Sequence, residues 1–98
     1  MNTHARRGHS KELYEAILSL ETVEECIGFF EDLCTMTELS AMEQRYLVAE
    51  ALHKGKIYNE ILAETGASSA TISRVNRTLQ YGNGAYELVF SRLGDAEE

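Results

Sequence analysis

The sequence contains no proline and no tryptophan, and only two of its 98 residues are cysteine. Proline interrupts helices because it lacks a backbone N–H and its ring clashes with the preceding turn, so the chain is free to be helical throughout. No apolar run approaches the ~18–20 residues that a membrane-spanning helix needs. The start, MNTHARRGHSKELYE, turns polar where a secretion signal would turn apolar. We therefore expect a cytoplasmic protein with no membrane contact.

Patterns for metal binding and catalysis are also missing. Cys26 and Cys34 lie eight residues apart, which is ~12 Å along a helix and too far for a disulfide. They form no CxxC or Cys/His cluster of the kind that holds zinc. None of His4, His9 and His53 is spaced with a nucleophile or carboxylate in a recognisable catalytic pattern. We expect two buried free thiols, no metal, no cofactor and no enzymatic activity.

The chain is long enough for one small domain with a modest core, since a chain of this size buries only ~60–65% of its unfolded surface. Its formal net charge is −7, but the charge is unevenly distributed. Residues 10–52 carry −8, whereas residues 53–82 carry four basic side chains against two acidic ones. Because phosphate binding depends on the charge of the contacting face, the acidic total does not exclude DNA as a partner.

Helical periodicity and capping residues predict six helices and no strand. The first follows Ser10, and the boxes T-V-E-E at 22–25 and T-M-T-E at 35–38 start the second and third. The third is predicted to end near His53, before Gly55. The remaining helices are expected at about 58–65, 69–79 and 85–93, with a flexible arm at 1–9 and an acidic tail at 94–98. The predicted buried positions of the second and third helices are Val23, Cys26, Ile27, Phe30, Leu33, Cys34, Leu39, Met42, Tyr46, Ala49 and Leu52.

The segment 57–79, IYNEILAETGASSATISRVNRTL, has the organisation of a helix-turn-helix. Ile57, Ile61 and Leu62 are expected to face inward, the last two packing against Ile72 and Val75. Gly66 suits a left-handed backbone at the turn.

Small and basic residues follow that turn. Ser68, Ser69, Ala70 and Ser73 are small enough to bring the backbone deep into a major groove, and free N–H groups at a helix start attract phosphate. Arg74 and Arg77 can reach phosphates or guanine edges. The alternatives are that Ser68 or Ser69 serves only as a helix cap and that Arg77 is only solvated.

These residues, ETGASSATISRVNRTL followed by YGNGAY, resemble the Trp repressor superfamily, and within it the TrpR-like YerC/YecD-type branch. The resemblance covers residues 10–93, and G-A-x-x-A-T-I-[ST]-R is its specific core. It implies an all-α, six-helix Trp-repressor-like fold in an intertwined homodimer, with two reading heads on successive major grooves of a palindromic operator. It also places a DNA-contacting polar residue at Asn59. The candidate DNA-binding residues are Lys56, Asn59, Ser68, Ser69, Ala70, Ser73, Arg74 and Arg77.

The resemblance further implies an effector pocket at Arg45, Arg74, Thr35 and Thr78. In the Trp repressor the two matching arginines sandwich the indole of L-tryptophan, and a glycine makes room for it. That glycine is Val75 here, and filling a packed site costs ~1–3 kcal/mol, so we do not expect L-tryptophan as corepressor. The effector stays unknown, and Arg45 has a simpler alternative in an ion pair with a nearby glutamate.

The leading hypothesis is a homodimeric, sequence-specific transcriptional regulator of double-stranded DNA, expected to be a repressor rather than an enzyme. The alternative is a non-enzymatic helical protein-interaction module with a vestigial helix-turn-helix, which the net charge of −7 favours.

Overall fold

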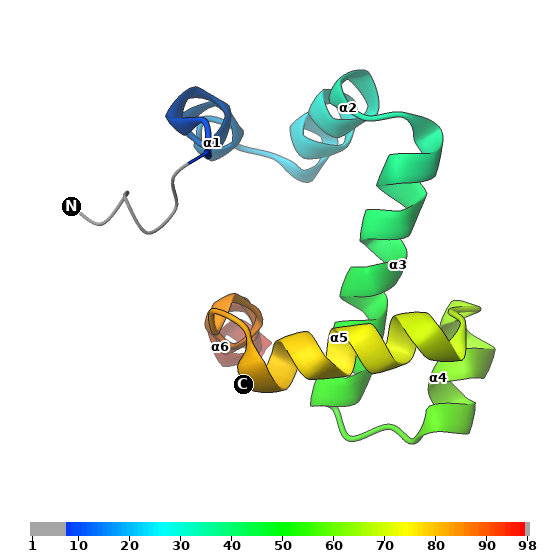
Figure 1. The fold of residues 1–98 in the computed structure, drawn as a ribbon. Coiled ribbons are helices and arrows are strands. Elements are labelled where there is room, and N and C mark those ends of the chain that lie inside the picture. The colour runs from blue at the N-terminus through cyan, green and yellow to red at the C-terminus, as the bar shows by residue number, and fades with distance from the viewer. Residues whose placement is uncertain (1–7, 98) are drawn as a thin grey trace. The chain divides into compact units, whose positions relative to one another are not determined.

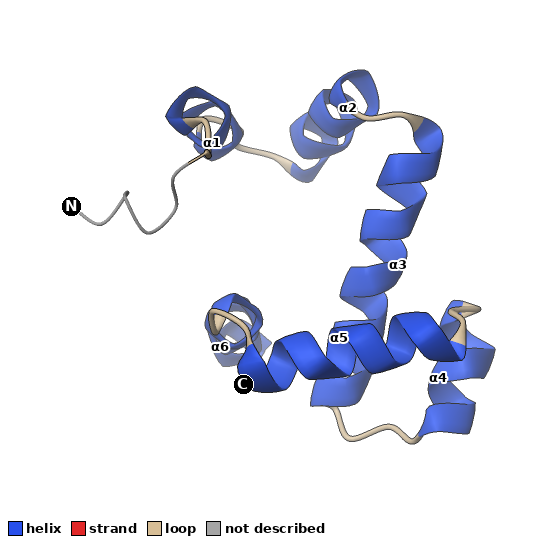
Figure 2. Ribbon diagram, viewed as in Figure 1, coloured by secondary structure: helices blue, strands red, loops and turns tan. Residues whose placement is uncertain are grey.

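The computed structural model describes residues 8–97, and over that range it consists of helices without any strand (Figures 1 and 2). No helix in this described part is long and apolar enough to cross a membrane. The all-α prediction is confirmed. The chain divides into two units, one ending at Met36 and the other beginning at Thr37. The six helices found within residues 8–97 are α1 (Lys11–Leu18), α2 (Val23–Leu33), α3 (Met36–His53), α4 (Tyr58–Thr65), α5 (Ser69–Tyr81) and α6 (Ala85–Glu97).

Side-chain caps explain where the first two helices begin. The Ser10 hydroxyl accepts the N–H of Leu13 at 3.2 Å, and the Thr22 hydroxyl accepts the N–H of Glu25 at 3.0 Å. Each bond satisfies a backbone donor that has no partner within its helix. The capping box predicted at Thr22 is modified, because the Glu25 carboxylate accepts the N–H of Glu21, at 2.7 Å, in place of that of Thr22.

The first unit contains α1 and α2, and neither helix has a buried residue. Val23 is 69% exposed, and Ile27 and Leu33 are about half exposed. The predicted burial of these three residues is therefore wrong for the single chain, because two short helices do not have enough surface to enclose their own apolar faces. Cys26 and Cys34 are half-buried and free, so the prediction of unpaired thiols is confirmed but that of full burial is not.

The second unit holds the core. Figure 1 shows α5 crossing α3, with α4 next to the start of α5. Apolar side chains from all four of its helices meet there, and Ile61 and Val48 are completely enclosed. Burying one such side chain contributes about 1.5–3 kcal/mol. The buried residues are Val48, Ala49, Ala51, Ile61, Ala67, Ile72, Val75 and Phe90.

The inner face of α3 differs from the predicted stripe. Ala49 is buried as expected, but Met42 is exposed, and Val48 and Ala51 take inner positions. All buried residues of α3 lie in its second half, where the core cluster forms, and Leu39 in its first half is only half-buried.

Two helices run past their predicted ends. α5 continues to Tyr81 rather than residue 79, and α6 continues to Glu97 rather than residue 93. Gly94 does not terminate α6, because its φ is not positive and one helical glycine costs only about 1 kcal/mol. Residues 94–97 therefore belong to the helix and not to a separate tail. Most of the predicted arm (residues 1–7) and Glu98 lie outside the described residues.

Candidate nucleic-acid interface

A tight turn joins α4 to α5. α4 ends at Thr65, and Gly66 adopts the left-handed conformation (φ 70°, ψ 9°) while its N–H bonds to the Leu62 carbonyl at 3.0 Å. An L side chain is strained in this conformation, which explains glycine there. Ala67 then turns its methyl into the core, and α5 begins two residues later. The predicted helix-turn-helix geometry is confirmed.

The inward face of this motif is narrower than expected. Ile61, Ile72 and Val75 share the buried cluster, as predicted. However, Leu62 is 39% exposed and Ile57 is more exposed still. Ile57 cannot cap α4 with its own side chain, and the Glu60 carboxylate accepts the Ile57 N–H at 3.0 Å.

The start of α5 presents small side chains to solvent. Ser68 is the cap: its hydroxyl accepts the N–H of Thr71 at 3.1 Å and donates to the Thr71 hydroxyl at 3.2 Å. Ser69, Ala70 and Ser73 are exposed in the first turns. Of the two serines considered as caps, Ser68 fills that role, and Ser69 is left on the surface.

The two arginines of α5 are both exposed but face different surroundings. Arg77 lies seven residues after Ala70 and four after Ser73, so the three share one helix face, opposite buried Ile72. Arg74 lines a cavity instead. Neither arginine takes part in an ion pair within the described part of the chain.

The two candidate DNA-binding residues that precede the turn, Lys56 and Asn59, differ in their surroundings. Asn59 is exposed in the first turn of α4. Lys56, by contrast, places its Nζ 2.9 Å from both carboxylate oxygens of Glu64. The hydrogen bond to Glu64 raises the pKa of Lys56. The charge of Lys56 is therefore already paired with that of Glu64 in the single chain. The sequence around Lys56 does not indicate this pair.

An open cavity of about 440 Å³ lies between α3, α5 and α6. It brings together three of the four predicted effector residues, and the fourth, Thr35, belongs to the first unit. The predicted alternative for Arg45, an ion pair with a glutamate, does not occur among the described residues. Val75 forms part of the cavity wall while being only 2% exposed. The lining residues are Arg45, Arg74, Val75, Thr78 and Tyr86.

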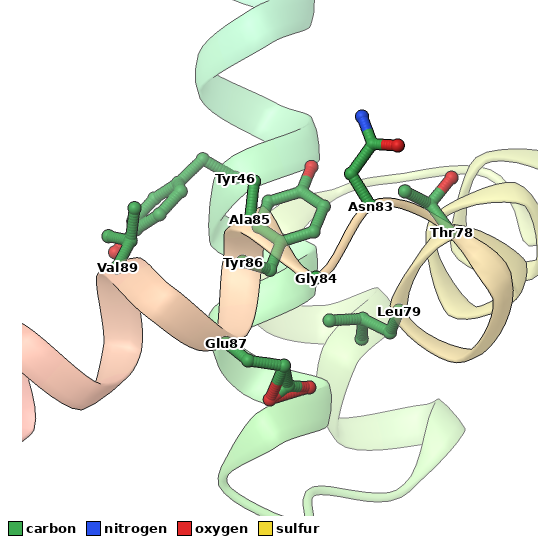
Figure 3. Close-up of a pocket in the computed structure, with 9 residues that line it drawn as sticks. All are labelled: Tyr46, Thr78, Leu79, Asn83, Gly84, Ala85, Tyr86, Glu87 and Val89. Atoms are coloured by element: carbon green, nitrogen blue, oxygen red, sulfur yellow. The ribbon is translucent and has the colours of Figure 1, made fainter. Parts of the chain in front are cut away.

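A second cavity of about 270 Å³ shares Thr78 and Tyr86 with the first. Figure 3 shows the Tyr86 ring in the middle of its wall, with Asn83 and Thr78 on the α5 side. Burial raises the pKa of Tyr46, another lining residue, and the charge of Glu50 acts in the same direction. This wall is largely aromatic and aliphatic, so it differs from the arginine-lined cavity beside it.

Gly82 makes the turn next to these cavities possible. Its N–H bonds to the Thr78 carbonyl at 2.8 Å, and a Cβ at this position would lie 2.6 Å from that same oxygen. Any side chain at position 82 would therefore force the end of α5 to move.

One contact of the turn has no signal in the local sequence. The Gln44 side-chain amide donates to the Thr65 carbonyl at 3.1 Å, joining α3 to the end of α4. The two residues are 21 positions apart, so no helical or capping pattern connects them. No group of three or more His, Cys, Asp or Glu residues in the described ranges could hold a metal ion.

These features define a protein of the helix-turn-helix type, and the chain belongs to the Trp repressor family, a family of DNA-binding regulators. The family model, described as Trp repressor protein, matches residues 9–94. The resemblance found in the sequence is therefore confirmed.

The relatives extend over nearly the whole chain. The uncharacterised protein YerC of Bacillus subtilis (strain 168) is 51% identical over 86 residues, which cover 88% of this chain and 83% of YerC. A crystal structure from Staphylococcus aureus, provisionally assigned as a Trp repressor, is 47% identical with a TM-score of 0.86, covering 96% of this chain and 95% of that one. A TrpR-like protein from Eubacterium eligens ATCC 27750 is also 47% identical with a TM-score of 0.86, covering 95% and 96%.

Proposed function

We propose that the chain is a sequence-specific DNA-binding transcriptional regulator that acts as a repressor, with α5 as its reading helix. The observation that carries this proposal is the exposed face formed by Ser69, Ala70, Ser73 and Arg77. Small residues let a helix approach base edges closely, and an adjacent arginine supplies a phosphate or guanine contact. Family membership supports the same role.

A second copy of the chain is part of the proposal. The apolar side chains of α1 and α2 are exposed in the single chain, and burial against another copy would remove them from water. A two-fold dimer would present two reading helices at half-sites ~34 Å apart, matching a palindromic operator. The proposal also includes the expected cytoplasmic location, which is consistent with a role on DNA.

We further infer that L-tryptophan is not the effector, although the arginine-lined cavity has room for some ligand. Val75 occupies the position where the Trp repressor has a glycine for the indole, and its side chain belongs to the core as well as to the cavity wall. Calorimetric titration with L-tryptophan should show no binding to the natural chain. Binding by the natural chain at micromolar concentration would contradict this, and a gain of binding in Val75→Gly would support the steric reason.

The test of the main proposal is a mobility-shift assay with the full chain on DNA from its own promoter region, at 50 and 200 mM salt. Phosphate contacts release counterions, so binding should weaken strongly at the higher salt. A sequence-dependent shift is expected at low salt. The absence of any salt-sensitive shift on promoter or random DNA would instead favour the protein-interaction module.

A further inference from the structure

The hydrogen bond between Gln44 and Thr65 reaches the turn of the helix-turn-helix from outside the motif. Its donor is Nε2 of Gln44 on α3, its acceptor is the last carbonyl of α4, and the bond is partly buried. The other side-chain hydrogen bonds found around this turn span eight residues or fewer. Gln44 therefore provides the long-range polar link between the turn and the helix beneath it.

Thr65 is the point where the bonds of the turn converge. Its hydroxyl donates to the Ile61 carbonyl at 2.8 Å and accepts the N–H of Ala67 at 3.1 Å. The carbonyls of a final helical turn have no partner within the helix, and Gln44 supplies one for Thr65. The end of α4, the turn and α3 are thus joined through one residue, four positions before Ser69.

Apolar packing alone leaves this region less well defined. α5 rests on α3 through Ile72 and Val75, and such contacts are non-directional. A hydrogen bond has strict limits of distance and angle. The bond from Gln44 consequently fixes where the turn lies, and with it the first residues of α5.

We propose that Gln44 is a positioning residue for base discrimination: it holds the start of α5 in register without touching DNA itself. This inference rests on the proposed function. Contacts to base edges require accurate placement of Ser69 and Ser73, whereas phosphate contacts from long flexible side chains tolerate small shifts. Loss of the bond should therefore reduce sequence discrimination and leave non-specific binding unchanged.

The test compares Gln44→Met, which keeps the length but has no donor, with Gln44→Lys, which keeps a donor able to reach the Thr65 carbonyl. A duplex is first selected from a random-sequence library by the natural full-length chain. The quantity measured is the ratio of affinities for the selected and a scrambled duplex, in which the uniform effect of the added lysine charge cancels. Hydrogen exchange of the Ala67 amide and the thermal unfolding midpoint are measured in parallel.

We expect Gln44→Met to lower the affinity ratio about threefold to tenfold, because one hydrogen bond changes an equilibrium constant by about that factor. Its affinity for scrambled DNA should stay within about twofold, and Ala67 exchange should accelerate. Gln44→Lys should keep the natural ratio. An unchanged affinity ratio in Gln44→Met would overturn this inference but not the proposed function. The same holds if the variant loses affinity equally for both duplexes and its unfolding midpoint falls. If the natural chain selects no sequence, the proposed function fails and the inference with it.

Discussion

The two units of the chain differ in how many apolar side chains they bury. Residues 37–97 enclose eight apolar side chains between four helices, including Ile61 and Val48, which have no exposed surface. The helices of the first unit, α1 and α2, bury none, although their apolar residues recur at regular helical spacing. Local sequence therefore formed helices in both units, but only one unit contains enough neighbours to make a core.

This difference places the helix-turn-helix and the uncovered apolar faces in different units of the chain. The proposed reading helix α5 is fixed by contacts within its own unit, through Ile72, Val75 and the Gly66 turn. The first unit needs a surface from elsewhere, which the proposed dimer supplies. DNA reading and dimerisation should thus respond to mutations in different units.

The largest expected effect comes from the core of the second unit. Ile61→Ala should lower the free energy of unfolding by about 2–5 kcal/mol, because it leaves a cavity in an enclosed site. Its matched control is Leu62→Ala, one residue further on, where 39% of the side chain is already exposed. Urea denaturation followed by circular dichroism measures both. Equal losses in the two variants would mean that Leu62 is covered in solution, and the contrast would fail.

The second effect tests the first unit. Ile27→Gln should weaken the dimer at least about tenfold, because each copy loses apolar contact area, while glutamine keeps the helix favourable. Sedimentation over a range of protein concentrations measures the dissociation constant. Glu24→Gln, an exposed change in the same helix, should leave it unchanged. A natural chain that is monomeric throughout would refute the proposed dimer.

A smaller effect is expected at the surface of α5. The double change Ser69→Ala with Ser73→Ala should reduce discrimination between selected and scrambled DNA about tenfold, since direct base contacts are worth ~1–3 kcal/mol. Stability should not fall, because alanine favours helices. Ser68→Ala provides the contrast: it removes the cap and should cost about 1 kcal/mol of stability. If Ser68→Ala alone abolishes discrimination, the roles of cap and reader have been exchanged.

The smallest effect concerns the ion pair beside the turn. Glu64→Gln releases Lys56 from its two 2.9 Å contacts and should tighten binding to all duplexes about twofold to fivefold. The salt dependence should steepen by about one ion per chain. Fluorescence anisotropy at several salt concentrations measures both quantities. The gain should disappear in the double variant with Lys56→Gln, and its persistence there would show that Lys56 is not the phosphate contact.

The helices were predictable from the sequence because their signals are local. Ser10, Thr22, Ser68 and Gly66 each act within a few residues, and all four lie where the structure caps or breaks a helix. Gly94 shows the limit of such signals. A glycine ends a helix only when its backbone turns away, and here it does not.

The site was predictable in part. The meeting of Arg45, Arg74 and Thr78 at one cavity followed from the resemblance to a known family, not from spacing, because no local pattern joins α3 to α5. The pairs Lys56–Glu64 and Gln44–Thr65 were missed for the same physical reason. Each depends on how the chain returns on itself, and polar side chains on a helix surface carry no mark of which distant group they will meet.

The most direct test of the central claim is selection of bound duplexes from a random library by the natural full-length chain, followed by sequencing. A dimer with two exposed reading helices should enrich an inverted repeat whose half-site centres are about one helical turn, ~10–10.5 base pairs, or a multiple of it, apart. A bound pool with the same sequence composition as the starting library would contradict the assignment of α5 as a reading helix.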